Sequence, residues 1–90
     1  MEIIKEENKV YILNNDHKEI AYVLFPNIDD KTVVIESTYV SETLRGMGIG
    51  SKLMEACYEV INKSEKKAVL KCSYAIAWYD KHKEYSDILK

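Results

Sequence analysis

Glycine, proline and cysteine are scarce in this chain of 90 residues, which contains three, one and two of them. The two cysteines, Cys57 and Cys72, form no C-x-x-C pair, and with only two histidines they give no spacing typical of a zinc site. We therefore expect no metal. Long apolar runs are also missing, because no stretch approaches the ~20 apolar residues of a membrane helix and no apolar segment opens the chain. A cytoplasmic, reduced protein is the expectation.

The chain also lacks a charge excess of one sign. Its 13 basic and 15 acidic residues give a formal net charge of -2. A nucleic-acid-binding domain carries a clustered basic surface, and a peripheral membrane protein carries a polybasic patch. We therefore expect neither nucleic acid nor a membrane as a partner. The length supports one domain, residues 1–90, with a thin hydrophobic core.

The three glycines lie within five residues, at Gly46, Gly48 and Gly50. They follow a β-branched run and precede an amphipathic helical pattern, so their backbone amides are open to an anion at the first turn of a helix. The spacing is neither the G-x-G-x-x-G of a dinucleotide site nor a Walker A loop, because Ser51 separates Gly50 from Lys52. A phosphate or pyrophosphate is the expected ligand, and a glycine-rich turn without a ligand is the alternative.

Apolar runs and turn formers alternate along the chain and predict the order β-β-β-α-β-α. We place strands at residues 10–13, 20–25 and 32–40, a helix from Ile49 to a polar stop at 62–66, a strand at 67–72 and a second helix capped by Ser73. This is an α/β (α+β) chain with an antiparallel meander and one parallel crossover. Ligands of such sheets bind beyond the carboxyl ends of the strands, so Val40, the glycine loop and Cys72 are expected to surround one crevice.

The segment Arg45-x-x-Gly48-x-Gly50 resembles motif A of the GCN5-related N-acetyltransferases, the acetyl-CoA pyrophosphate loop with the pattern Q/R-x-x-G-x-G/A. Residues 35–40, 72–74 and 82–85 are similar to segments of the short acetyltransferase-like group, so the resemblance covers nearly the whole chain. It implies a truncated fold of that family, acetyl-CoA as cofactor and acetyl transfer to an amine of a small molecule or peptide. The expected cofactor-binding residues are Val40, Arg45, Gly46, Met47, Gly48, Ile49, Gly50 and Ser51.

Three side chains are candidates for catalysis, each with a structural alternative. Tyr79 lies in a segment that resembles the family's Y-x-K, whose tyrosine protonates the leaving thiolate, but an aromatic packed on the sheet fits equally. Cys72 precedes a helix N-terminus, whose field favours a thiolate able to carry the acetyl group, whereas buried cysteine is usually a small hydrophobe. His82 is a possible base or a helix cap.

The resemblance is incomplete beside the expected crevice. Ser37, Tyr39 and Lys83 stand where the short group often has histidine, glutamate and proline. Two of these departures remove obvious bases for an ammonium acceptor. The alternatives to an acetyltransferase are therefore a non-catalytic module that binds acyl-CoA or CoA, and an interaction protein that retains the fold. The sequence leaves open the acceptor, the oligomeric state and whether the protein is an enzyme.

Overall fold

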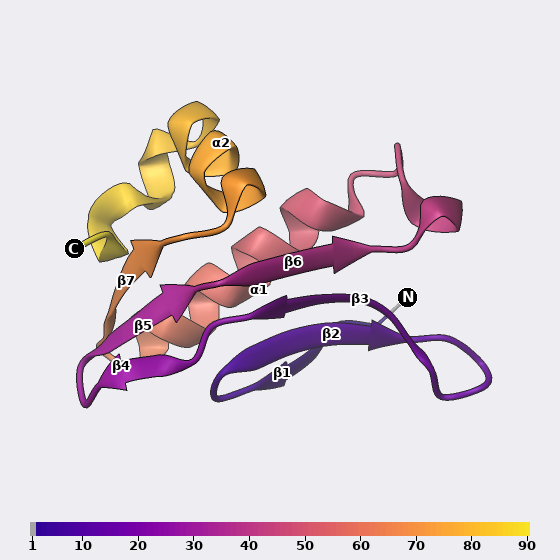
Figure 1. Cartoon of the computed structure of the whole chain (residues 1–90), viewed down its shortest axis with the longest axis horizontal. Coiled ribbons are helices and arrows are strands. Elements are labelled where there is room, and N and C mark those ends of the chain that lie inside the picture. Colours follow the sequence, from indigo (N-terminus) through magenta and orange to yellow (C-terminus); the bar gives the residue numbers. More distant parts are fainter. Residues whose placement is uncertain (1) are drawn as a thin grey trace.

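The structure, a computed structural model, describes residues 2–90 and contains two β-sheets with helix α1 behind them (Figure 1). The first sheet has the strand order β1-β2-β3-β6 and is antiparallel; its strands are β1 (Ile4–Glu6), β2 (Lys9–Leu13), β3 (Glu19–Leu24) and β6 (Ser37–Val40). The second has the order β4-β5-β7, with β4 (Asn27–Asp29), β5 (Thr32–Ile35) and β7 (Lys67–Leu70). The helices are α1 (Ile49–Lys63), α2 (Ser73–Lys81) and the 3-10 helices η1 (Glu42–Leu44) and η2 (Lys83–Ile88).

The predicted meander and crossover are confirmed, since β2, β3 and β6 pair antiparallel and β5 pairs with β7 in parallel. Strands β1 and β4 were not predicted, because three residues are too short to show a period of two. β4 lies within the segment expected to be a break. Ser73 is the first residue of α2 rather than its cap, and Cys72 occupies the N-cap position with an extended backbone.

The predicted strand at residues 32–40 is two strands that join different sheets. The switch occurs at Glu36, whose amide donates to the Leu24 carbonyl of the first sheet. One residue earlier, the Ile35 carbonyl accepts from the amides of Lys71 and Cys72, which follow β7. β6 and β7 therefore diverge from this point, because β6 pairs with β3 in the first sheet and β7 pairs with β5 in the second.

Helix α1 covers the buried face of the sheets with the stripe that its sequence predicts. Leu53, Met54, Cys57 and Ile61 are almost completely buried, and Val60 is half-buried beside them. They pack against Phe25, which follows β3, and against buried strand residues that include Val10, Ile12, Ala21, Val23, Val33 and Ile35. The apolar face of the helix, with its period of 3.6 residues, and the inner faces of the strands, with their period of two, thus form one core.

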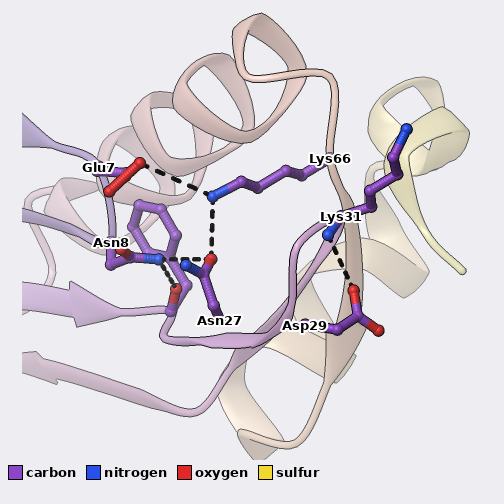
Figure 2. A network of polar contacts seen from close by, with 7 residues as sticks. Glu7, Asn8, Asn27, Asp29, Lys31 and Lys66 are labelled. Atoms are coloured by element: carbon purple, nitrogen blue, oxygen red, sulfur yellow. Dashed lines mark hydrogen bonds and ion pairs between the residues drawn. The ribbon is translucent and has the colours of Figure 1, made fainter.

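A polar clamp joins the two sheets at the end remote from the glycine loop (Figure 2). Asn8, in the turn after β1, donates from Nδ2 to the Phe25 carbonyl at 2.9 Å and to Asn27 Oδ1 at 3.1 Å. Lys66, just before β7, donates to the same Asn27 oxygen at 3.0 Å and lies 4.0 Å from Glu7 Oε1. These contacts hold the turns together where the sheets meet.

Candidate functional site

The glycine loop ends in an open helix N-terminus. Gly46 and Gly48 have φ values of 82° and 74°, a left-handed backbone that favours glycine. Gly48 is the N-cap of α1, and the first helical hydrogen bond runs from the Lys52 amide to the Gly48 carbonyl at 3.2 Å. The amides of the first turn, from Ile49 to Ser51, therefore have no partner within the helix and carry its positive dipole end. This arrangement suits an anion.

At Gly50 the space for a side chain is taken up by Tyr74. A Cβ atom at Gly50 would lie 2.5 Å from the Tyr74 hydroxyl oxygen. Tyr74 belongs to the first turn of α2, so the missing side chain at Gly50 leaves room for the tip of the Tyr74 ring beside the first turn of α1.

A cavity of about 390 Å³ connects the glycine loop with β6. This volume is within the usual range of small-molecule sites. Its walls are Thr38, Tyr39, Val40, Leu44, Arg45, Gly46, Gly48, Ile49, Gly50 and Tyr74. Six of the eight predicted cofactor-binding residues are therefore brought together, whereas Met47 and Ser51 are not part of this wall.

The Val40 amide points toward the gap between β6 and β7. On the opposite edge of β6, Ser41 donates its N–H to the Ile20 carbonyl across the β3 pairing at 2.9 Å. Because successive amides of a strand alternate between its two edges, the Val40 N–H faces away from β3, along the edge of the sheet. Arg45 Nε donates to the Val40 carbonyl at 3.2 Å and so anchors the loop to the same edge.

Cys72 lies across the gap from β6, with its Sγ 3.4 Å from Thr38 Oγ1. Partial burial acts to raise the pKa of the Cys72 thiol, but hydrogen bonds from the Thr38 side chain and from nearby backbone amides outweigh it, and the pKa lies below its ordinary value. The amides are those of Ala75, Tyr74 and Thr38. Cys57, by contrast, has a strongly raised pKa because it is buried on the apolar face of α1.

Tyr79 is buried away from this cavity. Only 3% of the side chain is exposed, and its hydroxyl has no hydrogen-bond partner among the described residues. Burial raises the pKa of Tyr79 strongly, and the charged or ionisable groups near it are Cys57, Tyr58 and Asp87. The structure thus does not bring Tyr79 to the residues that line the cavity, and its role as the acid stays a prediction.

His82 borders a second cavity, of about 260 Å³, that shares Tyr74 with the first. Its Nδ1 lies 2.8 Å from the Trp78 carbonyl and its ring stacks on Trp78 at 4.2 Å between centroids. Trp78 Nε1 donates to Ser51 Oγ at 2.8 Å, which ties the glycine loop to α2. His82 and Ser51 therefore line the same second cavity, whereas Val40 lines the first.

Comparisons with known proteins identify the family of the chain. The family model described as GCN5-related N-acetyl-transferase matches residues 9–88. The chain belongs to this family. Among curated proteins none matches.

Solved structures of other proteins have the same fold as this chain. A GCN5-like protein from Staphylococcus aureus, solved in solution by NMR, is 31% identical, with a TM-score of 0.80 over 99% of this chain and 87% of that one. GCN5 of Tetrahymena is 20% identical, with a TM-score of 0.67 over 81% of this chain and 48% of its own. Rv2747 of Mycobacterium tuberculosis, solved in complex with CoA, is 13% identical, with a TM-score of 0.66 over 84% and 47%. The last two show likeness of fold alone.

Sequence reasoning missed four of the residues that line the cavity of this GCN5-related chain, namely Thr38, Tyr39, Leu44 and Tyr74. Thr38 reaches Cys72, and Tyr74 closes over Gly50. The sequence could have indicated Tyr74, because it belongs to the segment 72–74 that resembles the short acetyltransferase-like group. Nothing in the sequence distinguishes Thr38 from the other β-branched strand residues. Among residues 2–90, no three His, Cys, Asp or Glu side chains gather closely enough to hold a metal ion, and no helix is long and apolar enough to cross a membrane.

Proposed function

We propose that this GCN5-related chain binds acetyl-CoA and transfers its acetyl group to an amine. The observation that carries the proposal is the cavity that runs from the open first turn of α1 to the exposed edge of β6. Acetyl-CoA combines a pyrophosphate, which needs clustered N–H donors, with a narrow arm that ends in a thioester. The two ends of the cavity offer these features in that order.

The glycine loop supports the pyrophosphate end. The amides of Ile49, Gly50 and Ser51 are free of helical partners, and Lys52 adds a positive charge in the first turn. Met47, 57% exposed, contributes through its backbone, because its side chain faces solvent. We assign Ser51 the same backbone role, since its hydroxyl already accepts from Trp78.

The β6 edge supports the thioester end. When bound, acetyl-CoA supplies an acetyl group activated as a thioester. The Val40 N–H can donate a hydrogen bond to a carbonyl oxygen that gains negative charge, which is the usual electrostatic assistance in acyl transfer. Cys72 as its thiolate can attack the thioester carbon, so that a bond from Sγ to the acetyl carbon forms while the bond to the CoA sulfur breaks and CoA departs as a thiolate. In the other route the neutral amine attacks the same carbon directly, CoA departs in the same way, and the nitrogen releases its proton to solvent.

Tyr74 is better placed than Tyr79 to protonate a departing thiolate. It lines the cavity, and partial burial together with the nearby Cys72 raises its pKa, so its hydroxyl keeps the proton at neutral pH. Tyr79 holds its proton as well, but among buried groups. Comparing Tyr74→Phe with Tyr79→Phe decides between them: turnover falls at the acid and stays near wild type at the other position.

Calorimetry with CoA and with acetyl-CoA tests the proposal first. We expect heat of binding with both, and a rise in melting temperature with ligand concentration, because a ligand that binds the folded state stabilises it. Coenzyme A release in the presence of amines tests transfer, and mass spectrometry after incubation with acetyl-CoA tests whether Cys72 gains an acetyl group. Binding without release would favour the non-catalytic module, and no heat at all would refute both.

A further inference from the structure

The face of the first sheet opposite α1 carries a row of aromatic side chains. The strand pairings place Ile4 opposite Tyr11, Tyr11 opposite Tyr22, and Tyr22 opposite Tyr39. Directly paired residues point to the same face of a sheet. The alternate residues, such as Val10 and Val23, are buried in the core beneath α1. The tyrosine row, defined here as Tyr11, Tyr22 and Tyr39, therefore lies on the face that Figure 1 shows in front of α1.

The protein already holds an alkylammonium group on this row. Lys9 Nζ lies 4.7 Å from the centroid of the Tyr11 ring and 5.9 Å from that of Tyr22. Both distances are in the range of cation–π attraction. Glu19 forms an ion pair with the same nitrogen, and Glu6 accepts a hydrogen bond from the Tyr11 hydroxyl at 2.8 Å. One carboxylate, that of Glu19, and two aromatic faces thus contact the Lys9 ammonium, and the Glu6 carboxylate lies beside the same row at the Tyr11 hydroxyl.

The row leads to the cavity at the β6 edge. The Tyr22 and Tyr39 rings are 5.5 Å apart, and Tyr39, which is 42% exposed, also lines the cavity. β6 is the edge strand next to the gap that opens toward β7. A cation that moves along the row from the Lys9 position toward Tyr39 thus comes to the strand whose Val40 amide we assign to the thioester.

We propose that the acceptor is an aliphatic primary amine, recognised in its ammonium form on the tyrosine row before it reaches the β6 edge. The inference rests on the proposed function, because an acceptor is needed only if the chain transfers an acetyl group. The aromatic faces attract a cation even though position 39 holds a tyrosine in place of the glutamate that is common in the short group. The carboxylates of Glu6 and Glu19 beside the row repel anionic acceptors.

NMR titration with 1,5-diaminopentane tests this recognition directly, without any need for turnover. The expected result is a set of saturable shifts in the amides and rings of Tyr11, Tyr22 and Tyr39. The neutral isostere 1,5-pentanediol has the same chain without the charges and is expected to leave these signals unmoved.

Variants at Tyr22 and Lys9 sharpen the test. Tyr22 lies outside the cavity, and Tyr22→Leu is expected to weaken diamine binding about two- to fivefold, as fits one exposed cation–π contact. Tyr22→Phe keeps the aromatic face and should keep the affinity. Lys9→Gln removes the internal ammonium that competes for the row, so binding should become tighter.

The proposal is overturned if the diol shifts the same signals, if Tyr22→Leu binds the diamine like wild type, or if Lys9→Gln is no tighter. CoA calorimetry on the Tyr22 variants separates this failure from failure of the proposed function. Normal CoA heat with no diamine response refutes the tyrosine row alone. Diamine binding with no CoA heat refutes the acetyltransferase and leaves only a cation site.

Discussion

β5 and β6 are adjacent in sequence and differ in almost every structural respect. β5 is buried at three of its four positions and lies between β4 and β7. β6 has no fully buried residue and forms an edge of the other sheet. Both consist of β-branched and polar residues, so local propensity alone does not separate them. Their partner strands separate them, because β5 pairs in parallel with β7 and β6 pairs antiparallel with β3.

The division at Glu36 turns one predicted strand into a buried strand, β5, and an edge strand, β6, that lines the cavity. The clamp around Asn27 holds the sheets together at one end, and the switch at Ile35 and Glu36 lets them separate at the other. β5 therefore carries stability, while β6 offers an unpaired edge and delivers the chain to the glycine loop. Substitutions in the two halves should separate these contributions.

The largest effect is expected from Ile35→Ala in β5. Ile35 is completely buried, so its truncation should lower the free energy of unfolding by about 2–5 kcal/mol, measured by urea denaturation. Should this variant fail to fold, Ile35→Val is expected to cost about 0.5–1.5 kcal/mol. CoA affinity of the folded fraction should stay the same in either variant. A loss of affinity at unchanged stability would reverse the roles assigned to the two halves.

Gly48→Val, in the loop that follows β6, should have the opposite signature. A non-glycine residue in the left-handed region costs about 1–2 kcal/mol, and a β-branched one more, so the loop would relax and turn its amides from the ligand. We expect CoA affinity to fall about 100-fold for Gly48→Val and about tenfold for Gly48→Ala, measured by calorimetry. Circular dichroism should show an intact fold. Equal affinity in all three proteins would remove the glycine loop from the site.

The clamp can be opened without touching either strand. Asn27→Ala deletes the oxygen that accepts from Asn8 and Lys66, and we expect a loss of about 1–2 kcal/mol in the free energy of unfolding. Glu7→Gln is the matched control, because Glu7 is exposed and lies 4.0 Å from the same lysine, so its effect should stay below about 0.5 kcal/mol. A larger loss of stability for Glu7→Gln than for Asn27→Ala would mean that the ion pair between Glu7 and Lys66 stabilises the clamp more than the hydrogen bonds to Asn27 do.

The sequence was sufficient for β2, β3, α1, β7 and α2, and insufficient for the short strands β1 and β4 and for the switch between the sheets. Helical spacing predicts the buried stripe of α1, and three clustered glycines predict the loop, because both signals are local. The break at Glu36 depends on which distant strands compete for each backbone edge, and no residue there is a breaker such as glycine or proline. The same limit applies to Thr38, whose contact with Cys72 spans the gap that the break creates.

Thr38→Val should give the smallest effect and the most direct view of the gap between β6 and β7. The Thr38 side chain helps to lower the pKa of Cys72, and valine preserves the shape while removing that hydrogen bond. The pKa of Cys72 should therefore rise, so that alkylation by iodoacetamide at a fixed pH near neutrality becomes slower. Thr38→Ser retains the hydroxyl and should retain the wild-type pH profile, while Cys57, buried on α1, should stay unreactive in all three proteins. Identical profiles for the valine and serine variants would mean that the Thr38 hydroxyl contributes nothing to the reactivity of Cys72, and that the backbone amides of Thr38, Tyr74 and Ala75 alone stabilise the thiolate.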